Sequence, residues 1–164
     1  MISTDIDTLL WAFPIVLGLH VTEEFALPGG FIHWIELYNP GRLRSTRYYY
    51  LINAAAIVGS IAIALLAGGP AGYWLYLYSV ALMAGNAVSH LRAALQQKRY
   101  CPGSVTGGLL LIPLLLLSSW QFIAKAVVGW PFAALGIGMG VFVGFFVFPV
   151  DARSIESNSA GRCG

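Results

Sequence analysis

One imidazole and two carboxylates lie within five residues, at His20, Glu23 and Glu24, near the end of an apolar run that begins at Leu9. On a helix, residues three and four apart lie on one face, so the three side chains are expected to point the same way. Such a set can bind a divalent metal ion or carry protons as an acid/base group. The alternative is a helix end whose Glu side chains reach out to water. Because ionisable groups within membrane spans are costly and usually functional, we favour a site.

The composition is that of an integral membrane protein. Of 164 residues, 58% are hydrophobic and 10% are Asp, Glu, Lys or Arg, against about 25% charged residues in soluble domains. The mean hydropathy is +0.75. Nothing indicates nucleic-acid binding, and two cysteines do not make a disulfide framework. We expect one transmembrane helical domain over residues 1–150 and a disordered polar tail over 151–164.

Five segments are long and apolar enough to cross a bilayer at about 20 residues each. They predict an all-α, polytopic membrane bundle with spans at 8–27, 48–67, 73–95, 105–127 and 132–150. The short segment 31–38 mixes aromatic and ionisable residues and predicts an interfacial helix. In the last span, Gly136, Gly140 and Gly144 recur every fourth residue, a spacing that lets a second helix approach closely. This span is therefore expected to serve packing, including contact between copies in a homo-oligomer.

Basic residues set the expected orientation in the membrane. Arg42, Arg44 and Arg47 follow the first span, and Lys98 and Arg99 follow the third. Cytoplasmic loops carry an excess of Lys and Arg, so five spans with the N-terminus outside place both clusters in the cytoplasm. The C-terminus is then cytoplasmic as well.

Polar residues from several spans are expected at the depth of His20, toward the cytoplasmic end of the bundle. Asn53 lies about one turn into the second span, Asn86 and His90 share a face of the third, and Thr106 begins the fourth. Scattered polar residues would not share one depth. This coincidence is the main sequence argument for a site.

A metal centre accounts best for these residue types. His20, His90 and one of the two glutamates, Glu24 in preference to Glu23, supply two nitrogens and one carboxylate, a set that holds a catalytic zinc and leaves a fourth position for water. His20 and Glu24 are four apart, as are ligands of other helical metal motifs. Zinc is the favoured ion and iron the second choice.

The remaining polar residues have expected roles around that metal. We expect Glu23 to act as general base on the attacking water. Asn53 and Asn86 are expected to orient a substrate carbonyl, stabilise an oxyanion or hold a His tautomer, unless they serve as hydrogen-bonding links between helices. A di-iron centre is the competitor, but it normally uses about four carboxylates. The spans offer only two, although His33 and Glu36 can join from the interfacial segment.

The order of these elements along the chain resembles the HXXEE family of small bacterial membrane proteins. The residues that carry the resemblance are His20-x-x-Glu23-Glu24, Asn53, Asn86-x-x-x-His90 and Pro102-Gly103-x-x-Thr106. The match covers about residues 10 to 130. The resemblance implies a bacterial inner-membrane protein with an active-site-like cluster, and it names no substrate.

These features predict a metal-dependent membrane hydrolase that acts on an apolar or lipid-like substrate near the cytoplasmic leaflet. The alternatives are a metal-ion or proton binding or transport protein and a di-iron oxidoreductase. Transport requires a polar path to the outer face, where Ser60 and Ser79 are among the few candidates. Two further residues each have two possible roles. Arg92 can extend its side chain to the lipid headgroups or bind an anionic substrate group, and Cys101 can be a buried small residue or a nucleophile.

Overall fold

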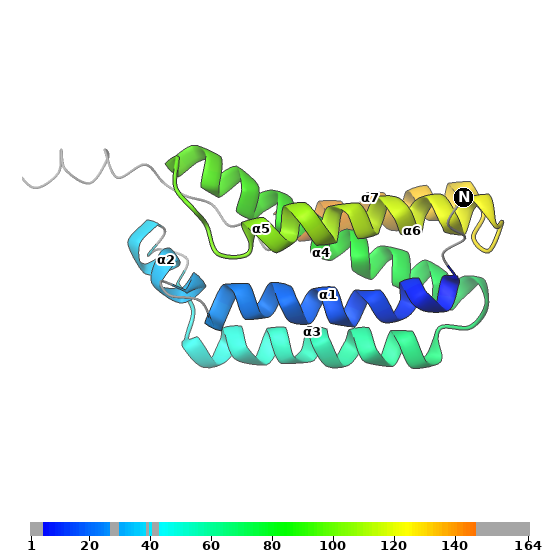
Figure 1. The fold of residues 1–164 in the computed structure, drawn as a ribbon, viewed down its shortest axis with the longest axis horizontal. Helices are drawn as coiled ribbons and strands as arrows, with labels where there is room; N and C mark the ends of the chain where they lie inside the picture. The colour runs from blue at the N-terminus through cyan, green and yellow to red at the C-terminus, as the bar shows by residue number, and fades with distance from the viewer. Residues whose placement is uncertain (1–4, 27–29, 39, 41–42, 147–164) are drawn as a thin grey trace, which may run out of the picture.

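The computed structural model describes residues 5–26, 30–38, 40 and 43–146, and within these ranges it contains helices and no strand (Figure 1). The predicted all-α class is therefore confirmed. In chain order the helices are α1 (Ile6–Ala26), α2 (Phe31–Tyr38), α3 (Thr46–Leu66), α4 (Gly69–Gln97), α5 (Ser104–Thr106), the π-helical turn η2 (Gly107–Leu111), α6 (Ile112–Ala124) and α7 (Trp130–Phe146).

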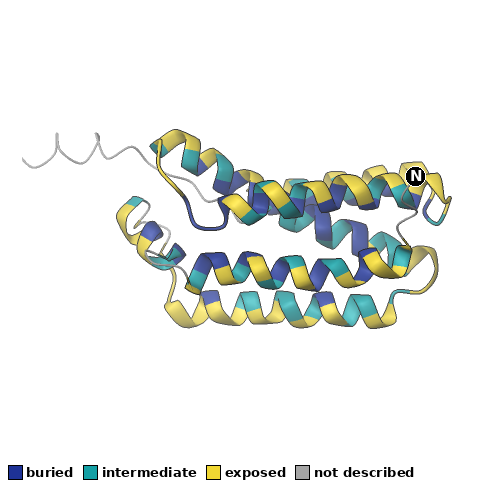
Figure 2. Ribbon diagram, in the orientation of Figure 1, coloured by how far each residue is buried: buried dark blue, intermediate teal, exposed yellow. Residues whose placement is uncertain are grey.

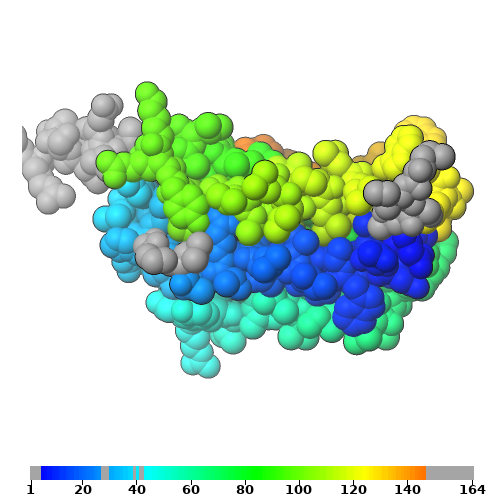
Figure 3. Space-filling model, viewed as in Figure 1, coloured from blue at the N-terminus to red at the C-terminus, as the bar shows by residue number. Residues whose placement is uncertain are grey.

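The first helix, α1, lies inside the bundle. It packs against α3 on one side and against η2 and α6 on the other, while α4 packs against η2, α6 and α7. Figure 2 shows the buried surface concentrated on α1 and the middle of α4, whereas α3 buries only Tyr49 and Ser60. In the space-filling view, α2 and the end of α4 lie at the same end of the molecule (Figure 3).

The buried hydroxyl of Tyr76 links three helices of the core. Tyr76 is fully buried, and its hydroxyl donates to the Leu9 carbonyl at 2.8 Å and lies 3.0 Å from Ser118 Oγ. The ring packs against Phe13 and Phe122 in the main apolar cluster. An unsatisfied hydroxyl at this depth would be costly, so this pairing fixes how α1, α4 and α6 meet.

Three helical segments are long and apolar enough to cross a membrane, at Ile6–Ala26, Thr46–Leu66 and Ser104–Ala124. The chain is thus an integral membrane protein. Trp130–Phe146 is apolar but has only 17 residues, and α4, with 29 residues, is not among the three. The five spans predicted from the sequence are therefore not all reproduced. The predicted ends at residue 27 and at 147–150, the position of Arg42 and the predicted disordered tail at 151–164 lie outside the described residues.

The fourth predicted span is interrupted near Pro113, as the sequence indicates, and a π-helical turn that the sequence did not indicate precedes this proline. The chain runs from α5 through the wide turn η2 into α6, which has Pro113 in its first turn. Proline has no N–H to donate, so the regular hydrogen-bond ladder cannot continue through it. Gly107, which begins η2, lies so close to α4 that an added Cβ would be 2.7 Å from Ala87 Cβ. π-Helical turns frequently occur at functional sites.

The glycines of α7 pack within the chain. A Cβ added at Gly136 would lie 2.9 Å from Trp74 Nε1, and one added at Gly140 would lie 2.8 Å from Ala81 Cβ. The predicted close packing of this helix is present, but its partner is α4. The proposed homo-oligomer contact through this glycine face is corrected, because α4 already covers that face.

Candidate metal centre

The last two turns of α1 place three ionisable side chains inside the protein. His20, Glu23 and Glu24 are 2%, 5% and 4% exposed, and His90 of α4 is 0% exposed. The predicted spacing thus produces one buried face on α1, and the alternative of Glu side chains reaching water is wrong. The layer lies near the end of the bundle that α2 and the segment after α4 occupy (Figure 1).

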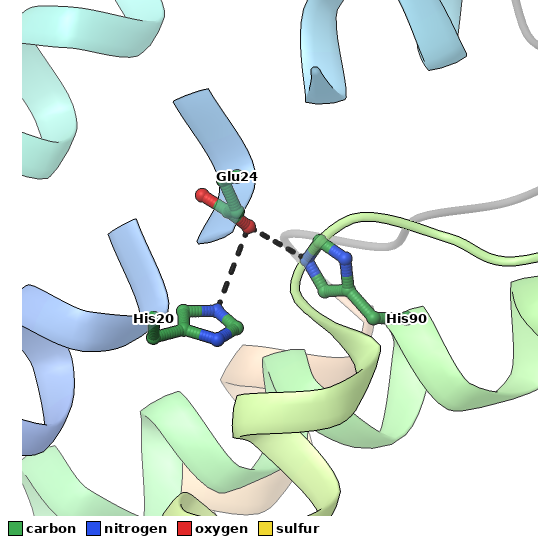
Figure 4. Close-up of side chains that lie close together, drawn as sticks. All are labelled: His20, Glu24 and His90. Carbon is green, nitrogen blue, oxygen red and sulfur yellow. Dashed lines mark ion pairs between the residues drawn. The ribbon is translucent and has the colours of Figure 1, made fainter. Parts of the chain in front are cut away.

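His20, Glu24 and His90 point toward one another (Figure 4). Glu24 Oε1 lies 3.5 Å from His20 Nε2 and 3.0 Å from His90 Nε2. One ligand atom from each residue lies within 4.8 Å of the other two. Tetrahedral zinc with bonds of about 2.0–2.1 Å has ligand atoms about 3.3–3.4 Å apart. The two measured distances bracket that value.

The second nitrogen of each imidazole is held by the protein. His90 Nδ1 lies 2.6 Å from the Pro102 carbonyl, and His20 Nδ1 lies 2.9 Å from Thr106 Oγ1. A carbonyl can only accept, so His90 carries its proton on Nδ1 and presents a lone pair at Nε2 when neutral. Both Nε2 atoms are buried and have no hydrogen-bond partner in the described part of the chain. Metal-binding histidines have this arrangement, with one nitrogen fixed and the other free.

The loop before α5 covers the centre with a glycine. Gly103 has φ +88°, a left-handed conformation that favours glycine. A Cβ at this position would lie 3.0 Å from His20 Cε1, 3.0 Å from His90 Nδ1 and 3.1 Å from Glu24 Oε1. Gly103 therefore leaves the space that the three side chains share, and the predicted Pro-Gly element belongs to the site.

Glu23 points into α5 and does not face the three clustered side chains. Its Oε1 accepts hydrogen bonds from the Tyr100 hydroxyl at 2.8 Å and from the Val105 N–H at 3.1 Å. Its Oε2 accepts from the Thr106 N–H at 2.7 Å and from the Thr106 hydroxyl. Four donors occupy both oxygens, which favours a structural or positioning role over the predicted role of base.

The two asparagines differ in their surroundings. Asn86 lies close enough to His20 to influence its imidazole electrostatically, which agrees with a supporting role beside His20. Asn53 Nδ2 donates to the Tyr49 carbonyl at 3.0 Å, one turn earlier in α3. A catalytic role for either residue stays a prediction.

Residues 11–118 match the model of the family described as "protein of unknown function with HXXEE motif". The chain belongs to the HXXEE family. No curated protein and no solved structure matches it. The matched range contains His20, Glu23, Glu24, His90 and Thr106.

The three ionisable residues of the HXXEE motif contact two different parts of the protein. His20 and Glu24, four residues apart, face His90 across the candidate centre. Glu23, three residues after His20, faces α5 through Thr106. The two glutamates of the motif therefore serve two different neighbours, which explains why both can be buried in one helix turn.

The sequence did not decide whether His33, Glu36, Arg92 and Cys101 belong to the site, and none of them is part of the cluster of His20, Glu24 and His90. His33 and Glu36 lie 3.7 Å apart on α2 with side chains 62% and 51% exposed. Arg92 is exposed, and its guanidinium lies over the Phe145 ring at 5.6 Å from the centroid. Cys101 is 0% exposed and lies with Sγ 3.6 Å from His90 Nδ1.

Two contributors, Tyr100 and Phe31, were not singled out from the sequence, and Pro102 was named there only as part of the Pro-Gly element. Tyr100 binds Glu23, the Pro102 carbonyl binds His90, and the Phe31 ring packs on the His90 ring at 5.1 Å between centroids. A backbone carbonyl leaves no mark in a sequence. Phe31 lies in the segment 31–38 that was predicted only as an interfacial helix, and its α2 packs inward through Phe31 and Trp34.

The Cys101 thiol is expected to be unreactive. Burial, with the nearby Glu24 and Glu23 carboxylates, raises the pKa of Cys101, so the thiolate is scarce at neutral pH. In a Cys163→Ser background, maleimide should label Cys101 at pH 8 only after denaturation. Rapid labelling of the folded protein would contradict the buried, neutral thiol.

Proposed function

We propose that this HXXEE protein is a divalent-metal-dependent membrane enzyme of hydrolytic type, with His20, Glu24 and His90 as the metal ligands. The single observation that carries the proposal is the pair of buried Nε2 atoms without hydrogen-bond partners beside Glu24 Oε1. Leaving two polar atoms unpaired at this depth costs free energy unless a ligand completes the site.

Charge supports a cation at this point. Glu23 and Glu24 are both buried, and their partners among the described residues are imidazoles, hydroxyls and backbone N–H groups. Two adjacent carboxylates in an apolar surrounding repel each other and lose hydration. A divalent ion offsets both charges.

A simple imidazolium–carboxylate pair explains the geometry less well. His90 Nε2 is only 3.0 Å from Glu24 Oε1, yet it forms no hydrogen bond with that oxygen. A protonated Nε2 would be expected to point its hydrogen at that oxygen. An ion placed between the two atoms needs no such alignment.

The ligand number favours catalysis over a purely structural role. Three protein ligands with a fourth position for water are typical of catalytic zinc sites, whereas structural zinc sites have four. When bound, the ion would supply Lewis acidity and activate water. Zinc is favoured over iron, and a two-iron centre is disfavoured because Glu23 is occupied by α5 and the exposed Glu36 pairs with His33.

The proposed substrate is apolar or lipid-like. A series of rings leads from the surface to the site: Tyr50 lies 5.2 Å from Phe25, Phe25 lies 6.5 Å from Phe31, and Phe31 lies 5.1 Å from His90, all between centroids. Tyr50 is exposed, Phe25 is half-buried and Phe31 is buried. This gradient provides an apolar route along which an acyl chain can approach the imidazole.

Transport of the ion is the weaker alternative. The two serines expected to mark an outward path donate to carbonyls of their own helices, Ser60 to Ile57 and Ser79 to Leu75. Apolar side chains fill the bundle between α1 and α4 beyond the site. These contacts give an ion no succession of ligands and favour an enzyme.

We further propose the membrane setting that the sequence indicates. It comprises a single domain over residues 1–150 with five spans, the N-terminus outside and the C-terminus in the cytoplasm of a bacterial cell. The described part of the basic pattern supports it, because Arg44, Arg47, Lys98 and Arg99 are all exposed near the start of α3 and the end of α4. The positive-inside rule then puts the metal centre near the cytoplasmic leaflet.

Metal analysis of detergent-purified protein tests the proposal. We expect about one divalent transition-metal ion per chain, as three ligands define a single site. Removing the ion with a chelator should lower the melting temperature, because ligand binding stabilises the folded state by mass action. A protein that takes up no zinc, iron, cobalt or manganese would overturn the proposal.

A further inference from the structure

We propose that Glu23 and Thr106 are positioning residues that hold His20 in the tautomer able to bind the metal. This inference rests on the proposed metal centre and assigns a role to Glu23, the first glutamate of the HXXEE motif. It explains which nitrogen of the His20 imidazole carries the proton, which the set of ligands alone does not determine.

Glu23 has the contacts of an ionised carboxylate. Backbone N–H groups can only donate, and Val105 N–H and Thr106 N–H occupy one oxygen each, at 3.1 and 2.7 Å. The Tyr100 hydroxyl adds a third donor at 2.8 Å and the Thr106 hydroxyl a fourth. An ionised carboxylate offers only acceptor sites, and this set uses them.

The direction of the Thr106 hydroxyl follows from that carboxylate. Its single proton goes to Glu23 Oε2, so only lone pairs of Oγ1 remain for other partners. His20 Nδ1 lies 2.9 Å from the same oxygen. Nδ1 must therefore be the donor, which places the proton of neutral His20 on Nδ1 and leaves the lone pair on Nε2, the atom that faces Glu24.

The two imidazoles thus reach the same tautomer by different means. His90 donates to a backbone carbonyl, which cannot reverse its role. His20 donates to a hydroxyl, which can donate or accept according to its other partner. Without Glu23, the Thr106 hydroxyl could turn toward Nδ1, and the proton of His20 would then move to the metal-binding nitrogen. Glu23 removes that freedom.

The arrangement uses the helical spacing of the motif. His20 and Glu23 are three apart on α1, and Thr106 of α5 lies between their side chains, bonded to both. The alternative is that Thr106 only fastens α5 to α1. That alternative predicts a loss of stability from its removal but no change in the tautomer of His20.

Thr106→Val and Thr106→Ser separate the two readings. Valine keeps the branched shape and removes the hydroxyl, while serine keeps the hydroxyl. We expect Thr106→Val to weaken cobalt and zinc binding about 10–100-fold, the usual cost of losing a partner of a metal-binding histidine. Thr106→Ser should restore most of the affinity. Thr22→Val is the matched control, because its hydroxyl donates to Gly18 within α1, away from the site.

A measurement on the metal-free protein tests the tautomer of His20 independently of metal binding. In the metal-free protein, ¹⁵N chemical shifts of labelled histidine should report His20 protonated at Nδ1 in the parent and in Thr106→Ser, and a mixture or the Nε2 form in Thr106→Val. If Thr106→Val keeps both the Nδ1 form and the parent's affinity, this inference is wrong. If the parent itself binds no metal but shows the Nδ1 form, the proposed function fails while the positioning role stands.

Discussion

Glu24→Gln is expected to abolish metal binding under conditions in which the parent protein is fully loaded. Glu24 Oε1 is the atom nearest to both Nε2 atoms, at 3.5 and 3.0 Å, and glutamine removes its charge. The affinity should fall by more than the roughly 10–100-fold that changes beyond the ligands cause. The metal-free variant should be as stable as the metal-free parent or more so, because it buries one charge fewer. Calorimetric titration with zinc and thermal melts with and without metal measure both quantities.

A histidine outside the site provides the control for this result. His33→Ala removes an imidazole that is 62% exposed and paired with Glu36, so it should leave metal content unchanged. Glu23→Gln should retain more affinity than Glu24→Gln, since Glu23 acts through Thr106. Equal and complete loss in both glutamate variants would favour a carboxylate-bridged two-metal centre. Full retention in Glu24→Gln would remove Glu24 from the ligand set.

Gly103→Ala is expected to have the second largest effect. Its Cβ would lie about 3 Å from atoms of His20, His90 and Glu24, which is tighter than nine in ten Cβ contacts, so these side chains must shift by a few tenths of an ångström. The three ligands must then move apart, and we expect a loss of affinity of about 10²-fold, the upper end of the cost of disturbing ligand positions. The backbone adds its own penalty, since φ is +88° and a left-handed conformation costs roughly 1–2 kcal/mol for a residue with a Cβ.

The chain offers a glycine that separates these two causes. Gly69 has φ +70°, and a Cβ added there would meet nothing within 4 Å. Gly69→Ala should therefore lower the melting temperature by a similar backbone penalty without altering metal affinity. If both variants bind metal like the parent, Gly103 does not shape the centre. If both lose affinity equally, the effect is global destabilisation.

Residue types and their spacing predicted those features that are set within a single helix, namely where a helix forms and which residues share one of its faces. The apolar run ending in His20, Glu23 and Glu24 gave α1 and its polar face, and the four-residue spacing of Asn86 and His90 gave the face of α4. These follow because the helical period alone decides which residues share a face. The shared depth of Thr106 and His20 was predicted from the lengths of the spans.

Features that depend on the packing of two segments were not predictable from spacing. Glu23 and Glu24 are chemically identical neighbours, and only the position of Thr106 distinguishes the one that meets α5 from the one that meets His90. The glycines of α7 predict close approach but cannot name the partner, which is α4 of the same chain. The turn η2 depends on the fit of Gly107 against Ala87, a contact between residues twenty positions apart.

Because the chain is synthesised from its N-terminus, the candidate centre can be completed only late in folding. His20 and Glu24 belong to the first helix, but the hydrogen bond that fixes His20 joins it to a residue 86 positions later. Chains fold from the N-terminus as they emerge, so α1 must wait for α4 and α5 before its imidazole has a partner. Until then, one helix supplies two ligands, too few for a firm grip on an ion. Under the proposed function, uptake of the ion would be a finishing step for an assembled bundle, and a newly inserted α1 would carry its two carboxylates without a counter-charge until that step is complete.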